Sequence, residues 1–291
     1  MNTSMQDAFN LGWKIASVIR GSARSKILDT YEQERLPIAT ALLEFDREIY
    51  QAITKEDESH RNLAHALRKE NSSASGLSIV YNSNLLIDSL KPLEEASEGH
   101  EDHHPGPTSH PTITNRMQVG SRLPNMEIMY HCDARVRRIH SVLAGQGCWN
   151  LAIFGGNISD EMQMARLHTL ATDLTQSPSV SKWAIQRQTS HPRFGSIDIL
   201  LIHSASRHDI DIHCMPEVFL PRHETTGFDY SKVFADNESF SGVGGTVYQE
   251  LGIPVTGCMI LVRPDHHIAY QGQLNETAEL DRFISRFLLF A

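Results

Sequence analysis

The stretch LAIFGGN, from Leu151 to Asn157, decides the fold of the larger part of this chain. Its four apolar residues follow Trp149 and end at two glycines, a pattern typical of a short buried strand. The run IDILLI (Ile197–Ile202) predicts a second buried strand. Between the two strands, residues 159–175 predict an amphipathic helix, because apolar residues recur there at helical spacing. These are Met162, Ala165, Leu167, Leu170 and Leu174.

The alternation of helices and strands continues toward the C-terminus. A helix is predicted to end over Tyr248–Leu251, and the runs Cys258–Arg263 and His267–Gln271 predict a hairpin around Pro264-Asp265. A closing helix is expected over Leu280–Leu289. Strand, helix, strand, then helix, hairpin and helix is the element order of a thioredoxin-like domain. The sequence therefore predicts a mixed α/β fold for this part of the chain.

The cysteines argue against redox chemistry in that domain. The four cysteines, Cys132, Cys148, Cys214 and Cys258, include no C-x-x-C pair. Where a thioredoxin carries its two cysteines, after the first strand, this chain reads Gly155-Gly156-Asn157. A thiol-redox enzyme is therefore disfavoured. We expect the cysteines to be reduced and mostly buried.

A helix is predicted over residues 3–20. Thr3 and Gln6 have the spacing of a capping box, and Gly21-Ser22 provides a stop signal. Apolar residues occupy almost every face of this segment. A helix of that kind is expected to be buried all round.

A second helix is predicted from Ser25 to about Ile53. Pro37 lies inside it and is expected to kink or break it. A short helix over residues 61–70 and a strand over Leu77–Tyr81 are expected to follow.

Residues 92–116 interrupt this pattern. They contain four prolines and two glycines and almost no large apolar residues, which indicates a linker or long surface loop. We therefore predict three parts: a helical part over residues 1–91, the linker, and the α/β domain over residues 117–291.

Composition excludes several classes of protein. The 291 residues carry 26 Lys and Arg against 35 Asp and Glu, a formal net charge of −9, which disfavours binding to nucleic acid. No apolar run approaches the roughly 20 residues of a membrane-spanning helix. The N-terminus has no basic region followed by an apolar one, as a secretory signal has. A cytoplasmic protein that binds neither nucleic acid nor membrane is expected.

Two N-terminal stretches resemble a known family. MNTSMQDAFNLGWKIA (Met1–Ala16) resembles the helix that follows a G-x-G-x-N loop in group A flavoprotein aromatic hydroxylases of the phenol 2-monooxygenase type. LDTYEQERLPIA (Leu28–Ala39) resembles the L-x-x-Y-x-x-E-R-x-P-x-A segment that follows in that family. The matching residues of the first stretch are Gln6, Asp7, Ala8, Asn10, Leu11, Trp13 and Lys14.

The C-terminal part resembles the same family. GSRLPN (Gly120–Asn125) is similar to the segment that opens its thioredoxin-like C-terminal domain. ADNESFSGVGGTVYQELGI (residues 235–253) and ILVRPDHHIAYQGQ (residues 260–273) are similar to its final segments. The first 91 residues would then be the helical remnant of an FAD-binding domain.

The resemblance implies an activity and a cofactor. In the family, NAD(P)H reduces FAD, and one oxygen atom of dioxygen is transferred to a phenolic ring. The first helix points its N-terminus at the N1–C2=O edge of the flavin, where a helix dipole stabilises negative charge. Met1, Asn2 and Thr3 are therefore the expected cofactor-binding residues. The family's C-terminal domain is associated with homodimers.

Other family motifs are absent from the sequence. It contains no G-x-G-x-x-G turn for the ADP part of FAD and no G-D motif, and no catalytic residue can be assigned. We expect the chain to be the C-terminal portion of a longer monooxygenase, to bind FAD weakly or not at all, and to lack activity alone. The alternative is a non-catalytic thioredoxin-like module for dimerisation or interaction.

Several polar residues have simpler interpretations than a site. No metal site is assigned to His100, His103, His104 and His110, because zinc needs an ordered scaffold. Surface positions are expected for His203, His208 and His213 and for the turn residues His266 and His267. Arg35 is expected to be structural, Trp149 and Trp183 to be core or dimer-surface aromatics, and Glu58-Ser59-His60 to form no triad.

Overall fold

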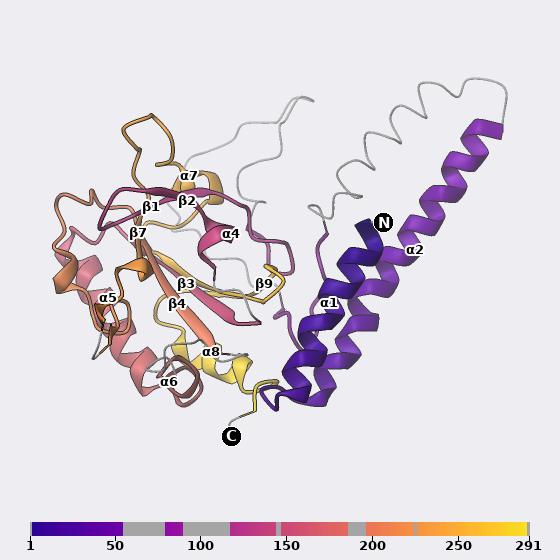
Figure 1. Ribbon diagram of the computed structural model, residues 1–291, viewed down its shortest axis with the longest axis horizontal. Helices are drawn as coiled ribbons and strands as arrows, with labels where there is room; N and C mark the ends of the chain where they lie inside the picture. The colour runs from indigo at the N-terminus through magenta and orange to yellow at the C-terminus, as the bar shows by residue number, and fades with distance from the viewer. Residues whose placement is uncertain are drawn as a thin grey trace, which may run out of the picture.

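The computed structural model describes residues 2–54, 79–89, 117–143, 147–185, 196–223 and 226–289. Two long helices, α1 (Asn2–Ile19) and α2 (Asp29–Thr54), lie side by side along one edge of a sheet domain (Figure 1). The short 3₁₀ helix η1 (Ser25–Leu28) leads from one to the other. Among the described residues, no helix combines the length and apolar character needed to cross a membrane.

α1 ends near Gly21-Ser22, where the sequence predicts a stop, and the chain turns there toward α2. We call this turn the corner. Gly21 has φ +69° and its amide donates to Val18, while the Ser22 amide donates to Ser17, the two bonds that close a helix with a left-handed residue. Pro37 was expected to kink or break the second helix. α2 is not broken there, because it runs from Asp29 to Thr54 with Pro37 inside it; the kink stays a prediction.

The C-terminal end of the chain holds this corner in place. Ala23 and Leu288 form an antiparallel bridge. The Arg24 amide donates to Phe287 at 2.9 Å, and the Leu289 amide donates to Ser22 at 3.0 Å. The segment between α1 and η1 is therefore joined through its backbone to the last described residues.

A mixed sheet of seven strands forms the rest of the fold, in the order β2-β1-β7-β4-β3-β8-β9. The first strands along the chain are β1 (Glu127–Tyr130), β2 (Val136–Arg138), β3 (Trp149–Gly156) and β4 (Ile197–His203). The later ones are β7 (Val233–Ala235), β8 (Cys258–Val262) and β9 (Ile268–Gly272). A separate small hairpin pairs β5 (Arg222–His223) with β6 (Gly227–Phe228).

The central four strands have thioredoxin-like topology, as predicted. β3 and β4 are parallel neighbours, β8 is antiparallel to β3, and β9 is antiparallel to β8. The helix α5 (Glu161–Gln176) connects β3 to β4, α7 (Val247–Leu251) precedes the hairpin, and α8 (Thr277–Ile284) follows it. The closing helix therefore ends earlier than Leu289. Two more short helices are α4 (Ile139–Val142) and α6 (Pro178–Ile185).

The core lies on both faces of β3, whose eight residues are all buried. Leu151 and Ile153 pack with α5 and α8, whereas Ala152 and Phe154 pack with α7. Trp149 is only 2% exposed, so it is a core aromatic as expected. Its ring lies edge-on to that of Trp13, with centroids 5.8 Å apart, and the core of the sheet domain thereby extends to α1.

Some predicted segments lie outside the described residues. These are the helix over 61–70, the linker over 92–116 with its histidines, and Glu58-Ser59-His60. The predicted domain boundaries at 91 and 117 therefore stay predictions. Of the strand expected over Leu77–Tyr81, the described part forms only an isolated bridge from Val80 to Ser121.

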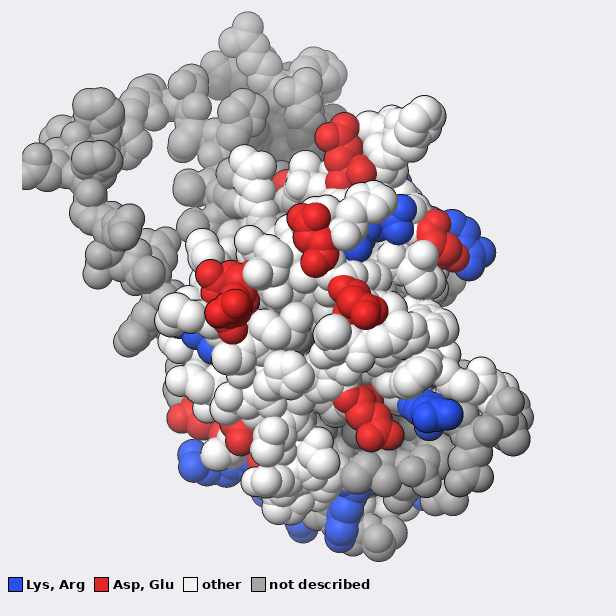
Figure 2. Space-filling model, turned by 90° about the vertical axis from the view of Figure 1, so that its left-hand side faces the viewer, with Lys and Arg blue, Asp and Glu red and all other residues white. Residues whose placement is uncertain are grey.

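Charged side chains are scattered over the face of the molecule away from α1 and α2, most of which is uncharged (Figure 2). In Figure 2, Asp and Glu side chains are spread across the middle of this face, while Lys and Arg lie mostly toward its rim.

Candidate functional site

The buried face of α1 is polar, contrary to the expectation of a helix buried all round by apolar contacts. Lys14 is fully buried and Asn10 is 2% exposed, beside Trp13 and Ser17. These four residues are spaced i, i+3, i+4 and i+7, so they share the face that meets the sheet domain. The opposite face exposes large apolar side chains: Met5, Phe9, Ile15 and Ile19.

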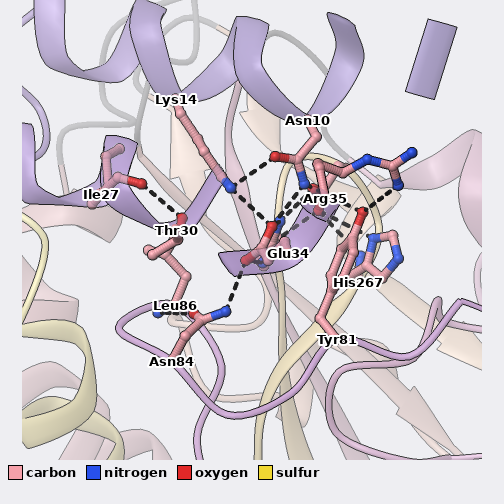
Figure 3. Close-up of polar contacts among 12 residues, drawn as sticks. Asn10, Lys14, Ile27, Thr30, Glu34, Arg35, Tyr81, Asn84, Leu86 and His267 are labelled. Atoms are coloured by element: carbon pink, nitrogen blue, oxygen red, sulfur yellow. Dashed lines mark hydrogen bonds and ion pairs between the residues drawn. The ribbon is translucent and has the colours of Figure 1, made fainter. Parts of the chain in front are cut away.

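Glu34 of α2 is the centre of a buried polar network (Figure 3). From α1, Asn10 Nδ2 donates to Glu34 Oε2 at 2.7 Å and Lys14 Nζ donates to the same oxygen at 2.8 Å. From the sheet domain, Arg263 Nη1 and Nη2 donate to the two carboxylate oxygens at 2.6 and 3.0 Å. Asn84 Nδ2 adds a bond of 3.1 Å. One carboxylate thus joins both helices to the sheet domain.

Arg263 and Asp265 bring the β8–β9 turn into this network. Arg263 Nε and Nη2 donate to Asp265 Oδ1 and Oδ2 at 3.0 and 2.6 Å, and Trp13 Nε1 donates to Asp265 Oδ2 at 3.2 Å. The two cations Lys14 and Arg263 face the two carboxylates Glu34 and Asp265, so the formal charges cancel. Balanced charge and multiple bonds are what buried ions require.

The pKa values of these groups follow from burial and from their partners. Burial alone would raise the pKa of Glu34, but Arg263 and Lys14 outweigh it and lower the pKa to about 2. Burial, with Arg263 nearby, lowers the pKa of Lys14 to about 8. Although burial opposes ionisation of Asp265, Arg263 holds its pKa well below the usual range. All four groups are therefore charged at neutral pH.

Arg35 forms a second link between α1 and α2. Its Nε donates to Asp7 at 2.5 Å, its Nη2 donates to Gln6 at 3.4 Å, and its Nη1 donates to the Tyr81 hydroxyl at 3.3 Å. Asn10 donates to the same hydroxyl at 3.3 Å. Arg35 is therefore structural, as expected, and it holds the second turn of α1.

The β8–β9 turn is covered, which corrects the expectation that its histidines are exposed. His267 is 7% exposed, and its ring stacks on that of Tyr81 with centroids 4.4 Å apart. His266 is half-buried and packs against His140 at 4.5 Å. A hairpin turn is usually exposed, but here α1, α2 and Tyr81 lie over it.

The predicted cofactor residues lie at the free end of α1. Met1 is outside the described residues, and Asn2 is described only by its backbone as the first helical residue. Thr3 is half-buried. The first turn carries no acidic side chain, so nothing there opposes an anion at the partly positive end of this 18-residue helix. The role of these three residues stays a prediction.

His203 is the other histidine that was placed wrongly. It was expected at the surface, yet it is fully buried at the end of β4, with its Nε2 2.9 Å from Nδ1 of His131. Burial, with His131 nearby, lowers the pKa of His203 to about 3. His208 and His213 are exposed, as expected.

The buried imidazole of His203 predicts a pH dependence of stability. Between pH 6.5 and 3, His203 is protonated in the unfolded chain but stays neutral in the folded chain. The free energy of unfolding therefore falls as the pH falls through this range. The expected slope from this group is about 1.4 kcal/mol per pH unit. Urea unfolding at pH 6.5 and pH 5.0 should show it, and His203→Gln should reduce the slope. An unchanged slope in His203→Gln, with exposed His208→Gln as control, would contradict this assignment.

A thioredoxin carries its thiols at the end of the sheet that follows the first strand. In this chain, side chains form hydrogen bonds to the backbone at that end. The Gly156 amide donates to the Tyr248 hydroxyl at 2.9 Å, and Gln163 Nε2 donates to the carbonyls of Gly155 and Thr256 at 2.8 and 2.9 Å. The nearby Cys258 is fully buried, and burial raises the pKa of its thiol. These residues are structural and offer no reactive thiolate.

Neither the other cysteines nor any group of potential metal ligands forms a site in the described residues. Cys148 is buried like Cys258, but Cys132 and Cys214 are exposed, so the expected burial holds for half of them. All four are free. In the described part of the chain, no three His, Cys, Asp or Glu residues are grouped so that they could hold a metal ion.

Comparison with known proteins matches two parts of the chain to two known families. Residues 79–291 match the family "Phenol hydroxylase, C-terminal dimerisation domain", and residues 1–46 match "FAD binding domain". The chain is 32% identical to phenol 2-monooxygenase fsqG of Aspergillus fumigatus, covering 97% of this chain and 44% of that protein. It is 29% identical to FAD-dependent monooxygenase ankC of Aspergillus thermomutatus, covering 98% and 43%.

The fold also agrees with that of a solved structure. The flavin-dependent monooxygenase PieE, determined with FAD and substrate, matches with a TM-score of 0.51 and 17% identity over 98% of this chain and 43% of PieE. The chain spans less than half the length of these relatives. Because the family match covers most of the residues, the chain belongs to the phenol hydroxylase C-terminal dimerisation domain family.

Proposed function

We propose that this chain is the C-terminal portion of an FAD-dependent, NAD(P)H-using monooxygenase that hydroxylates phenolic substrates, and that it is not catalytically competent alone. The match of residues 1–46 to an FAD-binding domain supports this proposal, as do the names of the relatives. A cytoplasmic location stays an expectation from the sequence.

The observation that carries the proposal is the exposed apolar face of the two helices. On α1, Phe9 is 55% and Ile19 is 79% exposed, and on α2, Leu43 is 62% and Tyr50 is 69% exposed. Large apolar side chains exposed on both helices support an interaction surface on this pair. Because these helices match only a piece of an FAD-binding domain, the partner proposed for this face is the remainder of such a domain.

The same arrangement suits FAD at the N-terminus of α1. Unpaired amides and the helix dipole favour negative charge there, and the first turn contains no acidic residue. Met1, Asn2 and Thr3 would face the N1–C2=O edge of the flavin, which becomes negative on reduction. FAD would supply the redox and oxygen chemistry, while the protein supplies orientation and electrostatics.

The second candidate function is association of two copies through the C-terminal domain. The family description names dimerisation, and this domain forms most of the chain. We propose a homodimer, with an exclusively structural or interaction role as the alternative to the monooxygenase.

Flavin content separates these two functions. The N-terminal part of fsqG, up to where its match begins, would be joined to Met1 of this chain, and the purified chimaera compared with the 291-residue chain. We expect stoichiometric FAD and phenol-stimulated NADPH oxidation in the chimaera, and no stoichiometric flavin in the chain alone.

The exposed face provides the control. Phe9→Asp should lower the FAD content of the chimaera without destabilising the 291-residue chain, because Phe9 is exposed there. A folded chimaera that holds no FAD would contradict the monooxygenase proposal and favour the interaction module. Stoichiometric FAD in the 291-residue chain would contradict the statement that it is incompetent alone.

A further inference from the structure

The sheet domain holds α1 by contacts between residues far apart in the sequence. Asp265 accepts the Trp13 indole hydrogen, 252 positions away, and Arg263 reaches Glu34 from 229 positions away. Glu34 in turn binds Asn10 and Lys14 of α1. The middle turns of α1 are therefore attached, through Trp13 directly and through Glu34 indirectly, to one hairpin turn.

The hairpin turn is a rigid support for this attachment. Arg263 is fully buried, and its guanidinium forms paired bonds to Glu34 and to Asp265 at the same time. A planar guanidinium with paired bonds fixes direction as well as distance, which a lysine ammonium does not. The Arg263 amide also pairs with the His267 carbonyl at 2.9 Å, so the side chain stands on an ordered turn.

The link through Arg35 depends on the same turn. Arg35 lies next to Glu34 on α2 and holds Gln6 and Asp7, near the start of α1. Arg263 fixes Glu34, and Glu34 belongs to the turn of α2 that carries Arg35. The attachment of α1 through Glu34 thus starts from Arg263, and the one through Trp13 starts from Asp265.

We propose that Arg263 and Asp265, in the C-terminal domain, are positioning residues that set where the N-terminal turn of α1 lies against FAD. This inference rests on the proposed function, because it takes Met1, Asn2 and Thr3 to face the flavin. The C-terminal domain would then set the position of the N-terminal turn of α1 relative to FAD, in addition to any role in dimerisation.

Helix geometry makes this coupling effective. Trp13 lies 11 residues from Asn2, which is about 16 Å along a helix axis. A tilt of about 5° at Trp13 would move the N-terminus by about 1.5 Å, and misplacement by 1 Å can cost on the order of a hundredfold in rate. The charge field of a helix end also falls off within its first turn.

The test uses two conservative variants and one matched control. Arg263→Lys keeps the charge but removes the paired bonds. Trp13→Phe keeps an aromatic ring but removes the bond to Asp265 and part of the packing on Trp149. Arg135→Lys makes the same arginine change in an exposed pair with Asp133. Amide hydrogen exchange over residues 3–12 is measured in the 291-residue chain. The two-electron midpoint potential of FAD is measured in the fsqG chimaera.

The expected exchange rates rise at least tenfold in Arg263→Lys and about threefold in Trp13→Phe, and do not change in Arg135→Lys. In the chimaera, Arg263→Lys should weaken binding of reduced FAD relative to oxidised FAD about tenfold, a fall of about 30 mV in potential. A change in overall stability alone would not move the potential. The inference is overturned if the unmodified chimaera holds FAD but its midpoint potential does not change in either variant, Arg263→Lys or Trp13→Phe. If the unmodified chimaera holds no FAD, the proposed function fails, and this inference fails with it.

Discussion

Replacing Glu34 by glutamine is expected to lower the free energy of unfolding of the chain by about 3–5 kcal/mol. The substitution keeps the size of the side chain but removes the one carboxylate that faces both Lys14 and Arg263. Only Asp265 would remain against two buried cations, and a buried charge without a counter-charge is strongly destabilising. Urea unfolding at pH 7, followed by circular dichroism, measures the loss.

A second substitution shows whether charge balance is the cause. Adding Lys14→Met to Glu34→Gln removes one cation and restores the balance, so the double variant should recover part of the lost stability. A Glu34→Gln variant within 1 kcal/mol of the unmodified chain would contradict the charge-balance explanation. So would a double variant less stable than Glu34→Gln.

Replacing Gly257 by alanine should destabilise the sheet domain by about 2–5 kcal/mol. Gly257 has φ +77°, a conformation that costs other residues about 1–2 kcal/mol. An added Cβ would also overlap the carbonyl oxygen of Phe154 and lie 3.1 Å from Leu274. Relieving that overlap requires a backbone shift between β3 and β8, typically another 1–3 kcal/mol.

Gly252 provides the matched control for this prediction. It has a similar φ of +66°, but a Cβ built there meets nothing within 4 Å. Gly252→Ala should therefore cost only about 1–2 kcal/mol. Thermal unfolding of both variants decides the matter, and equal losses would show that the close approach to Phe154 contributes nothing.

The central strands and helices could be predicted because their signals are local. The runs LAIF and IDILLI became β3 and β4, and the apolar spacing of residues 159–175 became α5. The short strands β1 and β7 were missed because they have four and three residues. Strands of that length leave little periodic signal.

The polar network could not be predicted from local patterns. Lysine and asparagine usually lie on the exposed face of a helix, and an arginine and an aspartate flanking a proline are typical of an exposed turn. Arg263 and Asp265 pair with Glu34 and Trp13 across more than 200 positions. Lys14 and Asn10 join the network through Glu34 of the neighbouring helix. One signal was available, because all of these residues lie within the stretches that resemble the hydroxylase family. Those stretches meet in one place because they form one network.

His203 illustrates the same limit. Its spacing from His208 and His213 fits no common face, which correctly argued against a shared site. The spacing could not show that β4 continues one residue beyond its apolar run and places His203 against His131.

The central claim is that the Glu34–Arg263 pair joins the FAD-domain helices to the C-terminal domain. A double-mutant cycle with Glu34→Gln and Arg263→Met tests it most directly, with free energies of unfolding measured at pH 7. We expect each single variant to be strongly destabilised and the double variant to lose at least about 2 kcal/mol less than the sum of the two. Losses that add to within about 0.5 kcal/mol would contradict the claim.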